Sequence, residues 1–311
     1  MRVAVTGGAG FIGSNLTKRL VKDGLDVVVV DDLSTGLLAN LDIVDIDFQN
    51  VSLLNKKELS QIFKNVDFIF HLGARGSVPR SLQDPAATHE VNATGTLNVL
   101  EAARYRSIPI VFSSSSSVYG RNTSLPKNEE MWTSPLSPYA ASKLSAEAYV
   151  QSYAYSYDMP VTIFRFFNVF GPLQRPNHDY AAVIPKWIYR ALRNEPIQVY
   201  GDGSQTRDFT FVDTVVDILA SCLKSELNYQ TPINLAFGNK ISLNQVIELL
   251  LRSFPDLKIE FKEIRHGDVW DSQNSPELLR KLFPAISPID FESGLNQTIE
   301  WMRASLDQVG Y

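Results

Sequence analysis

The stretch "AVTGGAGFIGSNL", residues Ala4 to Leu16, decides the fold of this chain. It joins an apolar run to a segment with helical spacing, and three glycines, Gly7, Gly10 and Gly13, separate the two. One glycine permits a tight turn, the next lets the backbone approach a pyrophosphate, and the last lets the helix pack closely on the strand. The N–H groups and the dipole at the start of the helix would attract phosphate. Without its context, this spacing indicates a tight turn as strongly as a nucleotide site.

An acidic residue stands where the second apolar run ends. "VVVV" runs into Asp31, roughly 18 residues after Gly13, close to the spacing expected of a carboxylate that binds ribose hydroxyls. Because a carboxylate there would repel a 2′-phosphate, the sequence favours NAD over NADP. Asp32 is a further candidate contact, although a solvated turn charge is the simpler interpretation of it.

Short apolar runs recur along the first half of the chain and alternate with segments of helical periodicity. The runs are rich in Val, Ile and Phe: "RVAVT", "LDVVVVDD", "VDFIFHLGA", "IPIVFSSSSS" and "PVTIFRFFNV". Runs that do not alternate with polar residues suit strands buried on both faces of a parallel sheet. The pattern predicts an α/β fold with a doubly wound parallel (Rossmann) sheet.

After about Phe166 the pattern loosens, because prolines and glycines break the chain into short pieces. This part is expected to form a smaller, interleaved α/β domain that carries the substrate. The predicted cofactor domain covers residues 1–165 and roughly 209–239, and the predicted substrate domain covers 166–208 and 240–311.

Composition narrows the class of protein. The chain has 311 residues, 44% hydrophobic and 20% charged, as in an ordinary globular protein. Its formal net charge of -5 comes without a basic stripe and gives little support for nucleic-acid binding. Cys222 is the only cysteine and the four histidines lack ligand spacing, so neither disulfides nor a metal site are expected. With no signal-peptide pattern and no membrane-spanning run, a cytoplasmic protein is expected.

A second stretch, "SPYAASKLSAEAYV", carries candidate chemistry. Tyr139 and Lys143 are one helical turn apart and would share a face of a helix. An unperturbed tyrosine has a pKa of about 10, and a neighbouring ammonium, with the cationic nicotinamide of NAD, would favour the phenolate and let Tyr139 act as a base. The alternative is an exposed pair without function. Against it, the pair follows a Ser cluster, Ser113 to Ser117, that ends a predicted strand, where ligands of such folds bind.

Several motifs, in order along nearly the whole chain, resemble the extended short-chain dehydrogenase/reductase family: "TGGAGFIGSN", "DDLSTG", "HLGA", "VNATGTLNVLEAA", "SSSSSVYG", "YAASK" and "RFFNVFGPLQ". Within that family the chain is most similar to nucleotide-sugar 4-epimerases of the UDP-glucose and UDP-N-acetylglucosamine type. The resemblance implies NAD as a retained cofactor and a UDP-sugar as substrate. It also implies that the sugar is oxidised at carbon 4, rotates as its 4-keto form and is reduced on its other face.

The resemblance implies a role for each candidate catalytic residue. Tyr139 would take the proton from the carbon 4 hydroxyl while hydride leaves that carbon for NAD. Lys143 would bind the nicotinamide ribose and lower the pKa of Tyr139. Ser115 matches the catalytic Ser/Thr that hydrogen-bonds the same hydroxyl, and Ser117 would be a nearby polar contact.

The resemblance also extends the cofactor site. Phe11 and Ile12 would lie at the pyrophosphate, Leu72 to Ala74 along the cofactor, and Asn92 near the strand ends, where a helix cap is an equal alternative. "DIDFQN", around Asp47, departs from the family's form, which weakens its assignment to adenine. The predicted cofactor-binding residues are Gly7, Gly10, Phe11, Ile12, Gly13, Asp31, Asp32, Leu72, Ala74, Asn92, Ser113, Tyr139 and Lys143.

In the second half, the resemblance assigns contacts to the nucleotide. Asn168 and Arg207 would contact the diphosphate, and "IRHGDV" would supply Arg265 for phosphate and Asp268 for ribose. An arginine fork suits a diphosphate by geometry as well as by charge. Taken singly, each arginine is equally explained as a surface ion pair.

Two residues bear on the choice of sugar. Ser272 matches a gate beside the carbon 2 substituent, where serine leaves room for an N-acetyl group and tyrosine would exclude it. "YAAVIPKW", residues 180–187, also resembles epimerases that accept N-acetylated sugars. Arg175 would either face a uronate carboxylate, which suggests UDP-glucuronate 4-epimerase, or cap a loop.

Other functions remain open at this stage. A 4,6-dehydratase is disfavoured because Ser116-Ser117 replaces an Asp-Glu pair. A UDP-glucuronate decarboxylase is less easily excluded and stays an alternative, although the acidic partner expected near the Ser cluster is missing. An NAD-binding sensor or scaffold is the non-enzyme alternative. The family pairs through two helices, here 84–104 and 137–157, so a homodimer is expected, although such apolar stripes also simply cover a sheet.

Overall fold

The computed structural model describes residues 1–42, 45–176, 181–225, 228–264 and 270–305. The chain divides into two compact units, each discontinuous in sequence. The first unit comprises Met1–Thr123, Glu129–Phe166 and Val216–Leu235. The second unit comprises Ser124–Asn128, Phe167–Val215 and Ala236–Tyr311.

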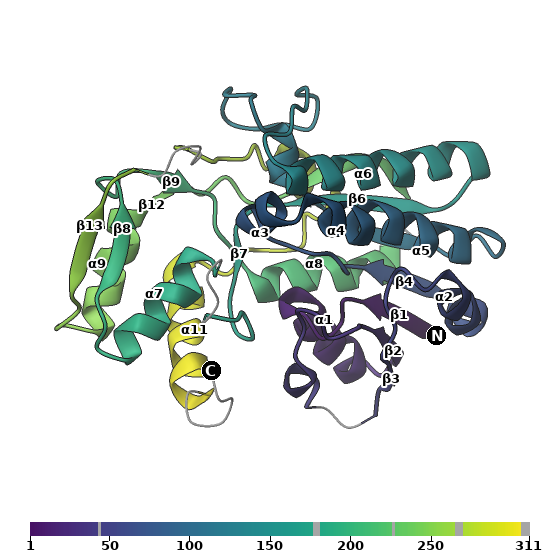
Figure 1. Ribbon diagram of the computed structural model, residues 1–311, viewed down its shortest axis with the longest axis horizontal. Coiled ribbons are helices and arrows are strands. Elements are labelled where there is room, and N and C mark those ends of the chain that lie inside the picture. The colour runs from purple at the N-terminus through teal and green to yellow at the C-terminus, as the bar shows by residue number, and fades with distance from the viewer. Residues whose placement is uncertain (43–44, 177–180, 226–227, 265–269, 306–311) are drawn as a thin grey trace. The chain divides into compact units, whose positions relative to one another are not determined.

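A seven-stranded sheet forms the centre of the first unit, with the strand order β11-β6-β5-β4-β1-β2-β3 (Figure 1). Every pair of neighbouring strands is parallel. The order runs outward from β1 in both directions, which is the doubly wound arrangement, and the predicted fold class is confirmed. The strands are β1 (Arg2–Thr6), β2 (Asp26–Val30), β3 (Asp47–Gln49), β4 (Phe68–His71), β5 (Ile110–Ser115), β6 (Val161–Phe166) and β11 (Tyr229–Leu235).

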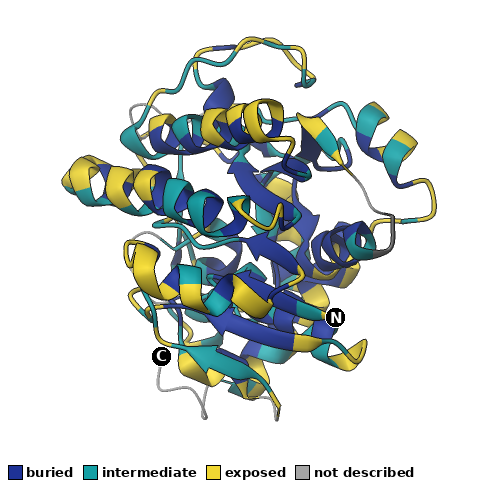
Figure 2. Ribbon diagram, turned by 90° about the vertical axis from the view of Figure 1, so that its right-hand side faces the viewer, coloured by how far each residue is buried: buried dark blue, intermediate teal, exposed yellow. Residues whose placement is uncertain are grey.

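Helices cover both faces of this sheet. One layer contains α2, α5 and α6, whose apolar residues form a core with those of the strands. Helices α1 and α8 are joined to each other by an ion pair between Arg19 and Asp217. Figure 2 shows the strands buried and the outer helix faces exposed. The helices are α1 (Phe11–Lys22), α2 (Lys56–Ile62), α3 (Val78–Gln83), α4 (Pro85–His89), α5 (Gly95–Arg104), α6 (Pro138–Tyr157) and α8 (Val212–Ser225), with short turns η1 (Leu38–Leu41), η2 (Phe63–Asn65), η3 (Glu90–Thr94, π-helical) and η4 (Ser116–Tyr119).

The helical ranges expected at 84–104 and 137–157 appear as α4 to α5 and as α6. Among the described residues, no helix is both long enough and apolar enough to cross a membrane. The homodimer and the cytoplasmic location stay predictions.

The glycine loop between β1 and α1 is too crowded for side chains. Gly7 has a φ of +69°, and a Cβ on it would lie 2.6 Å from the Gly73 Cα. A Cβ on Gly13 would lie 2.1 Å from the Gly7 carbonyl oxygen. Glycine at these positions therefore lets α1 start directly against the end of β1, as the sequence predicts.

In the described part of the second unit, strands pair in three two-stranded sheets: β7 (Val169–Phe170) with β10 (Thr210–Phe211), β8 (Ile197–Tyr200) with β13 (Ile259–Lys262), and β9 (Thr206–Arg207) with β12 (Ile241–Ser242). Its helices include α7 (Val183–Leu192), α9 (Leu243–Ser253), α10 (Glu277–Leu282) and α11 (Phe291–Ser305). Its core includes an aromatic cluster. The ring of Phe170 lies 5.1 Å from Phe291 and 5.6 Å from Phe211, between centroids.

Replacing Gly13 by alanine is expected to lower the free energy of unfolding by about 2 to 3 kcal/mol, because the added Cβ would force β1 or α1 to move. Urea unfolding followed by circular dichroism measures the change. Gly76→Ala is the matched control, since a Cβ there meets no atom within 4 Å. Equal unfolding midpoints for the two variants would contradict the steric argument.

Candidate active site

Three hydroxyl groups meet where β5 ends and α6 begins. Ser115 Oγ accepts hydrogen bonds from the Ser117 N–H at 3.2 Å and from Ser117 Oγ at 2.9 Å. The Ser115 side chain also interacts with Tyr139. Tyr139 is held in the first turn of α6 by the helix cap, where Ser137 Oγ accepts from the Ala140 N–H at 3.1 Å. The structure thus brings together Ser115, Ser117 and Tyr139.

Burial raises the pKa of Tyr139, and the hydrogen bond from Ser115 lowers it. The role of Lys143 in lowering this pKa stays a prediction. Lys143 is 3% exposed, and its ammonium lies 4.7 Å from the centre of the Phe112 ring. Burial lowers the pKa of Lys143 to about 7, against a raising effect of Glu147.

His71, on β4, is a buried residue of the site that the sequence only counted among scattered histidines. Its Nδ1 lies 2.7 Å from Thr6 Oγ1 and its Nε2 lies 2.9 Å from Thr96 Oγ1. Burial, and then Lys143, lower the pKa of His71 to about 3. The ring is therefore neutral at physiological pH and joins β1, β4 and α5. Only the three-dimensional contacts could have revealed this role.

The acidic residue predicted at the end of β2 is part of the glycine loop. Asp31 accepts hydrogen bonds from the Ala9 N–H at 3.0 Å and from the Leu33 N–H at 2.9 Å, and it is 9% exposed. Burial raises its pKa. Asp32 is exposed and accepts from the Ser34 N–H at 3.0 Å, as expected of a turn charge.

The loop fits the pyrophosphate of a dinucleotide. Helix α1 begins after Gly10 with no side-chain cap on its N–H groups and no acidic residue in its first turn. Phe11 and Ile12, which open the helix, are partly exposed. Unshielded N–H groups behind close-packed glycines are the arrangement that binds phosphate at a helix N-terminus. The first unit therefore has the residues to hold NAD.

Asn92 is not a helix cap. It lies 2% exposed in the π-helical turn η3, inside a helical run that continues on both sides. Its Oδ1 accepts from the Arg75 N–H at 2.7 Å and its Nδ2 donates to Ser142 Oγ at 2.9 Å. Asn92 thus fastens the loop after β4 to the helix turn that carries Lys143.

The remaining predicted cofactor residues line the carboxyl ends of β4 and β5. Leu72 and Ala74 are partly exposed in the loop after β4. Ser113 Oγ donates to the His71 carbonyl at 3.2 Å, so its hydroxyl serves the backbone between two strands. This position matches the edge of a doubly wound sheet at which ligands bind.

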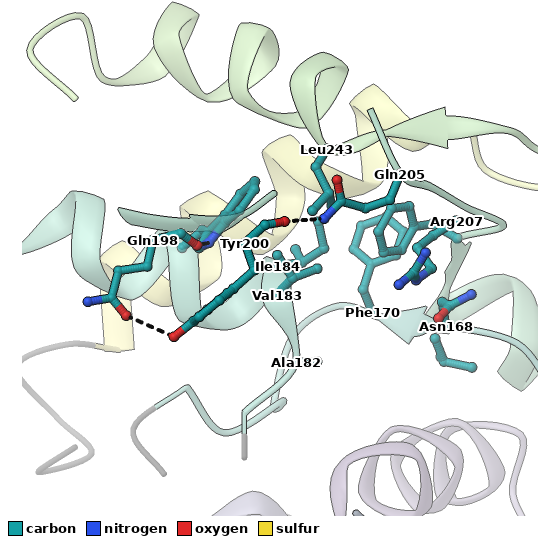
Figure 3. Close-up of a pocket in the computed structure, with 13 residues that line it drawn as sticks. Asn168, Phe170, Ala182, Val183, Ile184, Gln198, Tyr200, Gln205, Arg207 and Leu243 are labelled. Carbon is teal, nitrogen blue, oxygen red and sulfur yellow. Dashed lines mark hydrogen bonds between the residues drawn. The ribbon is translucent and has the colours of Figure 1, made fainter. Parts of the chain in front are cut away.

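The second unit has a cavity of about 290 Å³ lined by residues of α7, β8 and β9 (Figure 3). Asn168 and Arg207 lie at one end of it, and Gln198 and Tyr200 at the other. Gln205 Nε2 donates to the Tyr200 carbonyl at 2.6 Å, while its buried Oε1 has no hydrogen-bond partner among the described residues. The cavity thus offers aromatic surface, an unsatisfied acceptor and a cation.

Asp208 organises this end of the cavity, a role that sequence reasoning missed. It is fully buried and accepts from the N–H groups of Gly238 at 3.0 Å, Asn239 at 3.1 Å and Asn274 at 2.9 Å. Burial raises its pKa to about 6. Its position next to Arg207 was the only local signal.

The other predicted substrate residues are placed in part. Asn168 has a φ of +29° and donates to the Asp208 carbonyl at 3.1 Å. The Ser272 N–H donates to the Thr206 carbonyl at 3.1 Å, beside Arg207. Arg175 is partly buried and does not line the cavity. Arg265, Asp268 and Tyr180 lie outside the described residues.

Comparisons with known proteins bear on both units. Residues 3–236 match the model of the NAD dependent epimerase/dehydratase family. The solved UDP-N-acetylglucosamine 4-epimerase from Methanobrevibacter ruminantium M1, in complex with UDP-N-acetylmuramic acid, is 36% identical with a TM-score of 0.92, covering 98% of each chain. The UDP-glucose 4-epimerase of Mycolicibacterium smegmatis is 35% identical over 97% of this chain and 99% of its own. UDP-glucuronic acid decarboxylase 1 of Xenopus tropicalis is 33% identical over 98% of this chain and 73% of its own.

Because folded His71 is neutral, the free energy of unfolding should depend on pH in the acid range. Between pH 6.5 and about pH 3 the unfolded chain protonates His71 and the folded chain does not, so the free energy of unfolding falls as the pH falls. His71→Gln removes this contribution and should flatten the fall by up to about 1.4 kcal/mol per pH unit. Urea unfolding across that range measures it, with His89→Gln, at an exposed position, as control. Parallel pH profiles for wild type and His71→Gln would contradict a neutral His71.

Proposed function

The chain belongs to the NAD dependent epimerase/dehydratase family, and we propose that it is a UDP-sugar 4-epimerase that interconverts gluco and galacto isomers and accepts N-acetylated sugars. As a member of that family it is an NAD-dependent enzyme. The single observation that carries the proposal is that Ser115, at the end of β5, and Ser117, in η4, lie beside Tyr139 on the face of α6 that includes Lys143. A sensor or scaffold would not require a buried tyrosine with a serine hydroxyl and a lysine beside it.

Bound NAD supplies the chemistry of removing a hydride from carbon 4 of the sugar and returning it. In this proposal Tyr139 is the base that takes the proton of the carbon 4 hydroxyl and later gives it back. Ser115 stabilises the phenolate by donating to it, because Ser117 already occupies the acceptor side of the Ser115 hydroxyl. Lys143 is buried one helical turn away, and its ammonium form would favour the phenolate.

The second unit supplies the proposed nucleotide site. Arg207 and Asn168 would bind the diphosphate at one end of the 290 Å³ cavity. The base would lie toward Tyr200, and the unsatisfied Oε1 of Gln205 would accept an N–H of a pyrimidine. A buried acceptor without a partner is costly, so a donor from the ligand is the expected complement. Arg265 and Asp268 remain predicted contacts of the phosphate and the ribose.

Ser272 is the proposed determinant of the sugar. Its backbone is hydrogen-bonded beside Arg207, so its short side chain lies close to the proposed diphosphate site. A small residue there leaves room for a carbon 2 N-acetyl group. Relatives of nearly equal identity carry three different names, so similarity alone does not select the substrate. A uronate substrate, facing Arg175, is the second candidate.

The purified protein is incubated separately with UDP-N-acetylglucosamine, UDP-glucose and UDP-glucuronate, without added NAD. Each sugar that it accepts is expected to yield its galacto isomer. The carbon 4 and anomeric proton signals in NMR spectra measure it. A pentose signal from UDP-glucuronate would show decarboxylation instead, and a persistent 4-keto signal would indicate dehydratase chemistry. Three unchanged sugars, even after NAD is added, would exclude epimerisation of these substrates.

Ser272→Tyr is expected to lower kcat/KM for UDP-N-acetylglucosamine about 100-fold or more while UDP-glucose turnover is kept, because the ring would occupy the N-acetyl space. Ser272→Ala is the matched control, since it removes the hydroxyl without filling that space, and it should act on both sugars. Equal loss of both substrates in Ser272→Tyr, or no loss of either, would remove the gate.

A further inference from the structure

A buried network of charged and polar groups lies beneath the carboxyl ends of β5 and β6 in the first unit. Glu147 on α6 and Arg165 on β6 form a bidentate ion pair, with Nη2 to Oε1 at 2.6 Å and Nε to Oε2 at 3.1 Å. Their side chains are only 2% and 6% exposed. Ser114, which precedes Ser115, donates from Oγ to Glu147 Oε2 at 2.5 Å. One carboxylate therefore fastens α6 to two strands.

Strand register explains why these groups meet. Ser114, Arg165 and Asn234 are direct partners across β5, β6 and β11, so their side chains share a face of the sheet. Arg165 Nη1 donates to the Tyr119 hydroxyl at 2.9 Å, and Tyr119 donates to Asn234 Oδ1 at 2.7 Å. The guanidinium also lies 4.8 Å from the centre of the Tyr119 ring. Arg165 thus contacts η4, the turn in which Ser117 lies.

The same carboxylate stands one helical turn beyond Lys143. Tyr139, Lys143 and Glu147 follow each other at four-residue intervals on α6 and share a face. Arg165 and Ser114 already engage both oxygens of Glu147. The ion pair of Glu147 and Arg165 is neutral as a whole, so removing either partner would leave an uncompensated charge near the face of α6 that carries Tyr139.

We propose that Glu147 and Arg165 are a matched pair of positioning residues that set the charge balance at Tyr139. The inference rests on the proposed function, in which Tyr139 is the base. Glu147 lies about 12 Å along the helix from Tyr139. A unit charge at that distance in a poorly solvated interior changes the tyrosine titration midpoint by about one pH unit. Removing one partner of the pair should therefore shift the midpoint in the opposite sense to removing the other.

The other titratable groups around the network leave this balance in place. His71 on β4 is neutral above about pH 3. Burial raises the pKa of Tyr119, and this residue is present in every variant below. Glu129 accepts from the Asn234 N–H at 2.9 Å, and burial raises its pKa. It is the one further carboxylate that these contacts place beside Arg165 and Tyr119, and it is present in every variant below.

Charged groups on the helices packed against α6 are distant or solvated. Glu101 and Arg104 on α5 pair with each other at 3.0 Å and reach α6 at Tyr153, about 20 Å along the helix from its reacting end. Arg80, His89 and Glu90, on α3, α4 and η3, are partly or fully exposed.

The test is an ultraviolet phenolate titration of the NAD-bound protein, in which each variant is compared with its own Tyr139→Phe counterpart to isolate the Tyr139 signal. Glu147→Gln is expected to lower the midpoint by about one pH unit, and Arg165→Met to raise it by about one. The double variant should return close to wild type. Ser114→Ala is the matched control, because it removes a contact to Glu147 without changing a charge, and its midpoint should not move.

Shifts of the Tyr139 midpoint in the same direction for both single variants, or no shift in either, would overturn the proposal. A merely structural role would lower the stability of both variants without shifting the two midpoints in opposite directions. If a charge deletion does not fold, Glu147→Asp replaces it: withdrawal of the carboxylate by one methylene should lower the midpoint by less, and an unchanged or higher midpoint would overturn the proposal. The titration needs no substrate. Absence of turnover in wild type would therefore refute the proposed function separately from this inference.

Discussion

The ion pair between Glu147 and Arg165 is the interaction on which the arrangement of α6 against the carboxyl ends of β5 and β6 depends. It joins α6 to β6, and through Ser114 and Tyr119 it reaches β5 and η4. A buried pair adds little to stability over a well-packed apolar core, but loss of one partner leaves an uncompensated charge and is strongly destabilising. The pair is therefore better understood as a device that fixes position and charge than as a source of stability.

In the second unit, a buried carboxylate that accepts hydrogen bonds from the backbone fixes neighbouring segments, where the first unit uses a pair of charged side chains. Asp208 collects N–H groups from the segments at Gly238 and Asn274, and its own carbonyl accepts from Asn168. Arg207 is thereby held next to a residue that cannot move without breaking several hydrogen bonds. Ser272 is tied to the same place through the Thr206 carbonyl. The residues proposed to bind the nucleotide, which stand on or beside short strands, are thus held in place by hydrogen bonds to buried backbone groups.

The sequence predicts those features that depend on local pattern. The glycine spacing, the strand that ends in Asp31 and the Tyr139–Lys143 interval each lie within one or two neighbouring elements, so their geometry follows from the period of a helix or a strand. Asp208, Arg165 and His71 could not be assigned in this way, because their partners are far away in the chain and become neighbours only through sheet register. Asn92 was ambiguous for the same reason: its role depends on Arg75 and Ser142, which no local pattern connects to it.

Electrostatics explains why Lys143 could not be understood from the sequence alone. An exposed lysine beside a tyrosine would be an ammonium and would favour the phenolate directly, but burial lowers the pKa of Lys143 to about 7. Its charge then depends on what else is buried nearby. Because Glu147 favours the ammonium and Arg165 engages that carboxylate, the protonation of Lys143 is coupled to β6. The protonation of Lys143 therefore depends on contacts across the sheet, which the sequence of α6 alone does not contain.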